Sequence, residues 1–257
     1  MIHILFFLTA FLSEIAGTIG GFGSSVFFVP LAGLFFNIHT VLALTSILHV
    51  FSNTSKLIIF RKNIDLQLFL LIGIPSMVFV IFGAYLSTKI DTKYVELAMS
   101  VFLIAFSVLL YIFPDMSLTP DKPNAIAGGG LAGFLAGLIG TGGAIRGLTL
   151  TAFNLEKGMF VATSAAIDFG VDVSRLGIYL NHSFLERDYY WYIPVLILVA
   201  ISGSYIGKLL LKNISQKYFR KIVLIFIFLI GVTTLLQFSD KQKNQSIPVS
   251  MQVSDMN

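Results

Sequence analysis

Six ionisable side chains lie inside long apolar stretches of the sequence, where they cannot easily reach a membrane surface. They are Glu14, Lys56, Arg146, Asp168, Asp172 and Arg175. An unpaired charge near the centre of a bilayer costs about 2.5–3.5 kcal/mol on insertion scales, so such groups are usually paired and often functional. The three cations balance the three carboxylates, so a site that contains all six is formally neutral.

Two polar stripes at helical spacing contain four of these six residues. The stripes are Asp168, Asp172 and Arg175 in one stretch and, at a sequence offset of 119, His49, Asn53 and Lys56 in another. Positions i, i+4 and i+7 share one helix face, so each stripe presents polar groups ending in a cation. The alternative is structural: Arg175 forms a salt bridge with Asp172 or Asp168 that fixes helix register, and His49 is a packing histidine.

Two glycine-rich segments, GTIGGFG at 17–23 and GLIGTGG at 137–143, are candidates for backbone breaks that bind an anion. A half-helix that starts after such a break points unpaired N–H groups and a positive dipole end inward. The expected ligands are Gly20, Gly21, Gly23, Ser24 and Ser25 in one segment, and Gly140, Gly142, Gly143 and Arg146 in the other. The ladder Gly129, Gly133 and Gly137 instead predicts close helix packing.

A neutral site that receives an anion gains negative charge unless a carboxylate takes up a proton. We therefore expect proton-coupled anion movement, with Asp168 or Asp172 as the carrier and Glu14 and His49 as further candidates. Arg146 and Arg175 are expected anion ligands, because an Arg fork donates two parallel hydrogen bonds to an oxyanion. Lys56 is a supporting charge, and hydroxyls are available from Thr45, Ser46, Thr163 and Ser164.

The composition indicates which environment holds these residues. Of 257 residues, 56% are hydrophobic and 12% charged, against about 25% charged in an ordinary soluble domain. The chain therefore belongs in a bilayer, with room for about eight spans. A net charge of +4 fits basic loops that orient a membrane protein rather than a nucleic-acid partner. The absence of cysteine excludes disulfides and thiolate metal sites, and no metal-binding cluster is predicted.

Charges and Pro/Gly clusters divide the sequence into apolar blocks of roughly spanning length. The predicted blocks are 3–18 with 24–36, 40–60, 66–87, 94–113, 125–139 with 144–154, 158–180, 189–211 and 218–238. An all-α integral membrane protein is therefore expected.

An internal repeat organises these blocks. Residues 16–23 match 136–143 and residues 83–86 match 203–206, both at an offset of 120. Duplicated halves are a common transporter plan. The predicted units are 1–120, 121–240 and a polar, disordered tail, 241–257.

Each half opens with a glycine-broken stretch too long for one span and short for two, which predicts a helical hairpin followed by three spans. An odd number of crossings in each half makes the repeats inverted. The positive-inside rule then places both termini outside the cell membrane.

The sequence resembles the TauE/SafE sulfite-exporter family of membrane permeases over nearly its whole length. The resemblance is carried by GGFG at 20–23 with Pro30 and by GTGG at 140–143. The most specific stretch is 140–180, with GGAIR at 142–146 and ATSAA at 162–166. The resemblance implies a transporter of small sulfur-containing or organic anions, such as sulfite, thiosulfate or sulfonates, without a prosthetic group.

The function predicted from these patterns is a secondary transporter for a small anion. Three alternatives stay open: an anion channel, a membrane receptor or complex subunit without transport, and an intramembrane hydrolase. The hydrolase would use Glu14, His49 or the Asp pair as acid and base, although no nucleophile-base spacing supports it.

Overall fold

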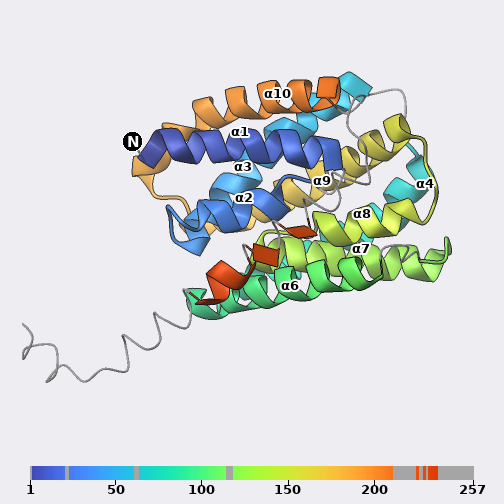
Figure 1. Ribbon diagram of the computed structural model, residues 1–257, viewed down its shortest axis with the longest axis horizontal. Coiled ribbons are helices and arrows are strands. Elements are labelled where there is room, and N and C mark those ends of the chain that lie inside the picture. The colour runs from blue at the N-terminus through green and yellow to red at the C-terminus, as the bar shows by residue number, and fades with distance from the viewer. Residues whose placement is uncertain are drawn as a thin grey trace, which may run out of the picture.

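The computed structural model describes residues 2–20, 23–60, 64–113 and 118–210, together with short pieces between 224 and 236. Every regular element within these ranges is a helix, which confirms the predicted all-α class (Figure 1). Five described segments are long and apolar enough to cross a membrane: Ile2–Ile19, Ile38–Phe60, Leu66–Ser87, Thr92–Ile112 and Tyr192–Leu210. Gly21, most of block 218–238 and the tail 241–257 lie outside the described residues.

The helices begin and end close to the predicted blocks. The first half contains α1 (Ile2–Gly20), α2 (Ser25–Ala32), α3 (Ile38–Phe60), α4 (Leu66–Leu68), the π-helical turn η1 (Phe69–Gly73), α5 (Ile74–Ser87) and α6 (Thr92–Ile112). The second half contains α7 (Lys122–Ile139), α8 (Gly143–Thr151), α9 (Lys157–Asn181), the 3₁₀ turn η2 (Arg187–Tyr189) and α10 (Tyr192–Leu210).

Glycine breaks separate α1 from α2 and α7 from α8. Gly23 and Gly140 both adopt positive φ angles, +82° and +79°, a left-handed conformation that glycine adopts without steric cost. At Gly17 a Cβ would lie 2.3 Å from the backbone nitrogen of Ser24, so α2 turns back closely against α1. The short arms have eight and nine residues, about 12–14 Å of helix, less than half of the hydrocarbon core.

The two hairpins enter the molecule from opposite ends. In Figure 1, α1 starts beside the marked N-terminus, whereas α7 starts at the other end and runs in the opposite direction. Their broken ends meet, since a Cβ on Gly23 would lie 4.0 Å from the Cα of Gly143.

The seam between α5 and α7 confirms the packing predicted for the glycine ladder. A Cβ on Gly129, Gly133 or Gly137 would lie only 2.1–2.4 Å from a carbonyl oxygen of the facing segment, which is η1 for Gly129 and α5 for the other two. The hydroxyl of Ser76 donates to the carbonyl of Gly129 across this seam at 2.8 Å. Small residues thus let the two backbones touch, as is typical of helices in lipid.

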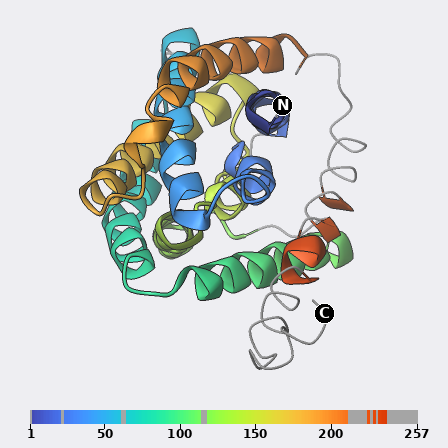
Figure 2. The ribbon, with the colours of Figure 1, turned by 90° about the vertical axis from the view of Figure 1, so that its left-hand side faces the viewer.

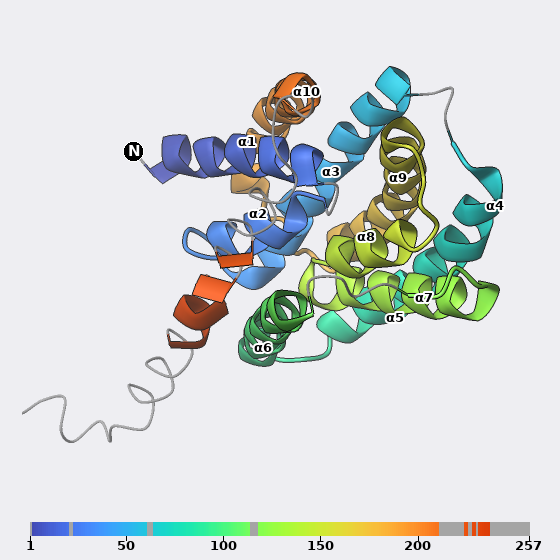
Figure 3. The ribbon, with the colours of Figure 1, turned by 45° about the vertical axis from the view of Figure 1, so that its right-hand side comes forward.

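The long helices α3 and α9 pack against each other at the centre of the molecule (Figure 3). On one side α3 contacts α10, which packs on α1; on the other α9 contacts α5, which packs on α7. At the repeat offset, α1 corresponds to α7 and α10 to α5. The α1–α10 and α7–α5 pairs are therefore equivalent to each other, and each joins a helix of one half to a helix of the other. The inverted relationship of the halves stays a prediction.

The outer surface of the bundle is apolar. Large side chains such as Phe82, Val101, Tyr111 and Leu198 are more than half exposed, while the polar residues Glu14, Ser52 and Arg175 are buried. In Figure 2, α6 and α10 lie along opposite edges of the bundle. An apolar outer surface around buried polar residues suits a protein that is surrounded by lipid.

Candidate functional site

Three ion pairs contain all six of the ionisable residues predicted to lie inside the membrane. The pairs are Glu14 with Lys56 at 2.8 Å, Asp172 with Arg175 at 2.6 Å, and Asp168 with Arg146. Of the two predicted partners for Arg175, the structure selects Asp172. The set of six is formally neutral. Two of the pairs belong to clusters of different character, and the third, Asp172–Arg175, lies apart from both.

The first cluster surrounds the carboxylate of Glu14, which lies on α1 and is fully buried. It receives hydrogen bonds from four hydroxyls and one ammonium group. The donors are Thr18 at 3.3 Å, Ser24 at 2.7 Å, Ser52 at 2.5 Å, Ser204 at 3.0 Å and Lys56 at 2.8 Å. We call these six residues the carboxylate cage. Ser204 comes from the second half, so the cage also joins α10 to α1 and α3.

His49 connects the cage to the Asp172–Arg175 pair. Because the hydroxyl of Ser24 donates to Glu14, the ring Nε2–H of His49 donates to Ser24 Oγ at 2.8 Å, a tautomer assigned from the network. The other ring nitrogen, Nδ1, lies 3.4 Å from Arg175 Nη2 and 3.7 Å from Asp172 Oδ1. Asn53 also donates to Asp172, at 2.8 Å, so both polar stripes meet at the α3–α9 contact.

Arg175 also donates hydrogen bonds to backbone carbonyls at the carboxyl end of α7. Its Nη1 donates to the carbonyls of Ala136 at 2.8 Å and Gly140 at 3.0 Å, and Tyr179 donates to the carbonyl of Gly137 at 2.5 Å. The last carbonyls of a helix have no intrahelical partner, and cations stabilise that end of the helix dipole. Arg175 is therefore placed as a cap for α7, and neither Arg175 nor Arg146 is among the residues that line the cavity described below.

The second cluster, which we call the arginine cluster, consists of Arg146, Ser164 and Asp168. Arg146 lies in the first turn of α8, directly after the break. Its Nη1 donates to Asp168 and its Nε to Ser164 Oγ at 3.1 Å. Its Nη2 is buried and has no hydrogen-bond partner among the described residues. That group faces the other break, 3.6 Å from the position of a Cβ on Gly23.

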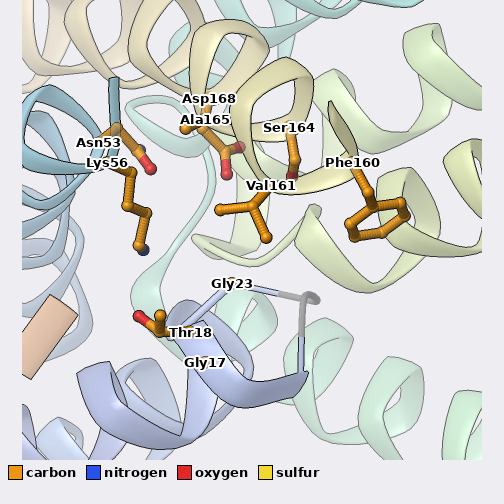
Figure 4. A pocket seen from close by; sticks show the side chains of 10 residues that line it. All are labelled: Gly17, Thr18, Gly23, Asn53, Lys56, Phe160, Val161, Ser164, Ala165 and Asp168. Carbon is orange, nitrogen blue, oxygen red and sulfur yellow. The ribbon is translucent and has the colours of Figure 1, made fainter. Parts of the chain in front are cut away.

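A cavity lies between the two clusters. It has about 300 Å³ of atom-free space including its open mouth, and it is lined by Gly17, Thr18, Gly23, Asn53, Lys56, Phe160, Val161, Ser164, Ala165 and Asp168. Figure 4 shows Lys56 and Asp168 on different sides of this space, with Thr18 and Gly23 across from them. The lining thus contains a cation from the first half and a carboxylate from the second.

Several predicted hydroxyls lie elsewhere. Ser46 donates to the carbonyl of Ala43 in its own helix at 2.8 Å, and Thr163 accepts from the backbone N–H of Asp65 at 2.9 Å. Ser25 is buried in α2, and Thr45 is buried with a hydroxyl that has no partner in the described part of the chain. Gly142 packs against α7, where a Cβ would lie 1.8 Å from the Ala132 oxygen.

Sequence reasoning named Ser24 but missed the other three hydroxyls of the cage, Thr18, Ser52 and Ser204. Thr18 follows Glu14 by four residues and Ser52 precedes Lys56 by four, spacings that place each beside its charged neighbour on a helix. Ser204 stands where the first half has Ala84, a polar difference inside a matched segment. Within the described residues, no group of His, Cys, Asp or Glu is arranged to hold a metal ion.

Buried ion pairs beside a cavity, between broken helices of an apolar bundle, define a polytopic membrane transporter. The chain belongs to the sulfite exporter TauE/SafE family, whose model matches residues 6–234. A probable membrane transporter protein of Methanocaldococcus jannaschii is 27% identical over 257 residues, covering 90% of this chain and 95% of the relative. No solved structure was found to match the chain.

Proposed function

We propose that this membrane transporter moves a small anion, such as sulfite, thiosulfate, a sulfonate or a related organic anion, through the cavity between the two glycine breaks. The observation that carries the proposal is the buried Nη2 group of Arg146, which has no hydrogen-bond partner among the described residues. A buried guanidinium N–H group without a partner is costly, and this one lies beside the cavity residue Gly23. An oxyanion at this position satisfies the unpaired donor.

The surroundings of Arg146 fit a small oxyanion rather than a large substrate. Lys56 supplies a second positive charge, and two of its N–H groups already bind Glu14 and Ser52. Gly23 places only backbone beside Arg146, since a Cβ there would lie 3.6 Å from Nη2. Helices α2 and α8 both begin at this junction, and their first N–H groups favour negative charge.

We also propose that a proton accompanies the anion and that Asp168 carries it. Asp168 lines the cavity with a side chain that is 15% exposed, whereas the Asp172 side chain is 3% exposed and is bound by Arg175 and Asn53. Protonation of Asp168 weakens its hold on Arg146 and keeps the site neutral when the anion arrives. Glu14 is surrounded by the cage and His49 is hydrogen-bonded to the cage residue Ser24, which supports Asp168 as the carrier.

The proposed setting is the cell membrane, with inverted halves and both termini outside. The opposed hairpins suit alternating access, in which one half moves against the other around a site at their junction. The orientation is tested with a reporter that is active only in the cytoplasm, fused to either terminus. Activity of that reporter would contradict the outside placement of the termini.

A thermal-stability screen tests the anion site. Purified protein is heated with sulfite, thiosulfate, sulfonates and carboxylates, and we expect one of these classes to raise the melting temperature. Arg146→Ala should weaken that binding by about 100-fold, because it removes hydrogen bonds to a charged group. Arg187→Ala changes an exposed arginine in the same way and should have no effect. If the anion stabilises Arg146→Ala as much as it stabilises the unaltered protein, Arg146 is not a ligand of the anion.

Proteoliposomes test the coupling. Anion uptake by the unaltered protein should increase with an inward proton gradient, and Asp168→Asn should abolish this dependence while anion binding persists. Asp188→Asn, in the exposed 3₁₀ turn η2, is the matched control. Uptake by the unaltered protein that is indifferent to the gradient would refute the coupling and leave the anion site standing.

A further inference from the structure

The carboxylate cage has the composition of an anion-binding site. Four hydroxyls and one ammonium group converge on the two oxygens of Glu14 from three helices and the start of α2. All six residues are buried. Hydroxyl and ammonium donors directed at one carboxylate form charge-assisted hydrogen bonds, which are stronger than neutral ones.

The repeat shows that this arrangement is particular to the first half. At an offset of 120, Glu14 corresponds to Phe134, Thr18 to Leu138, Ser24 to Ala144 and Ser204 to Ala84; at 119, Ser52 corresponds to Val171. Each of these five polar residues is thus apolar at its equivalent position. Only the cation is kept, since Lys56 corresponds to Arg175.

We propose that the cage is a binding site for a small carboxylate or similar oxyanion, and that its resident ligand is the chain's own Glu14 side chain. Glu14 supplies the negative charge that a free anion supplies in an open site, and it completes the hydrogen bonds of Lys56 and the hydroxyls. The tethered ligand keeps this site filled. Together with the transport site proposed above, this gives two anion sites in each chain. Because Glu14 occupies the cage, only the transport site binds a free anion.

Chemical rescue tests the cage without reference to transport. Glu14→Ala removes a CH₂–COO⁻ group, and acetate has the matching size and charge. We expect the variant to melt at a lower temperature than the unaltered protein, with acetate restoring about 5–10 °C in a saturable manner. Formate should restore less because it leaves space, and propionate less because it overfills the cage. Chloride at equal ionic strength should restore nothing.

Three further variants keep the test decisive. Glu14→Gln fills the cage without charge, so acetate should not stabilise it, and it should melt below Glu14→Asp, which keeps the charge on a shorter side chain. Glu186→Ala, at an exposed loop position, is the control for general effects of acetate. Equal acetate effects on Glu14→Ala and Glu186→Ala, or a Glu14→Gln protein as stable as the unaltered one, would overturn the proposal. Wild-type protein that binds no anion, with rescue of Glu14→Ala intact, would instead refute only the transport site.

Discussion

Glu14 and Arg146 are both buried charges beside a glycine break, but they differ in how fully their hydrogen-bonding capacity is used. Glu14 accepts from five groups, whereas Arg146 keeps an unpartnered Nη2 within the described structure. Each cluster contributes two residues to the cavity wall, Thr18 and Lys56 from the carboxylate cage and Ser164 and Asp168 from the arginine cluster. A buried charge with a full set of partners stabilises the fold; one with a spare donor beside a cavity is suited to binding a ligand.

Removing the cation from the cage should produce the largest change in stability. Lys56→Met leaves the carboxylate of Glu14 buried without its countercharge, which costs about 3–5 kcal/mol. Arg146→Met should cost less, because Asp168 lines the cavity and can be hydrated or protonated. Chemical denaturation in detergent measures both variants. If Arg146→Met is the less stable of the two variants, the proposed difference between a filled and an open site is wrong.

Crowding the cage from outside should have a smaller effect. A Cβ on Gly203 would lie 2.9 Å from both Cβ and Cγ of Glu14, so Gly203→Ala overpacks the α1–α10 contact at a cost of about 1–3 kcal/mol. Gly177→Ala is the control, since open space surrounds that position, and it should be neutral or stabilising by up to about 1 kcal/mol. Similar melting temperatures for the two variants would show that the cage tolerates displacement.

The smallest effect is expected at the start of α7, far along the chain from the glycine break. Asp121 accepts the backbone N–H of Asn124 at 2.8 Å, and this hydrogen bond lowers the pKa of the exposed Asp121 carboxyl below 3.8. The stabilisation is therefore complete above pH 3.8 and is lost as the pH falls through the lower folded pKa. Asp121→Ala should lower the melting temperature at pH 7 by about 2 °C.

The same comparison at acid pH supplies the control for Asp121. At pH 3 the melting temperatures of Asp121→Ala and the unaltered protein should lie closer together than at pH 7. A difference that grows on acidification contradicts the sign of the linkage.

The sequence was sufficient to predict the helical class, the blocks that fall within the described residues and the six residues of the three ion pairs. Apolar runs and the charges that interrupt them are properties of the chain itself, and the repeat places residues from the two halves in correspondence. It also predicted that Gly129, Gly133 and Gly137 form a packing surface, because small residues at every fourth position leave one helix face flat.

The partners of those charges could not be predicted in the same way. Asp168 and Asp172 share a helix face with Arg175, and only the crossing of α3, α8 and α9 decides that Asp168 pairs with Arg146. The capping role of Arg175 depends on backbone carbonyls, which every residue carries and no sequence pattern marks. Ser52 and Ser204 are common residue types whose importance follows from their contact with Glu14.

The span of the cage along the chain has a consequence for biosynthesis. Glu14 and Ser204, which form a hydrogen bond, are separated by 190 positions. Because a ribosome makes the chain from its amino terminus, α1 must wait in the translocon or the bilayer with an incomplete set of donors until α10 has been translated. Helix α1 therefore gains its contact with α10 late in translation, and until then the carboxylate of Glu14 lacks the hydrogen bond from Ser204.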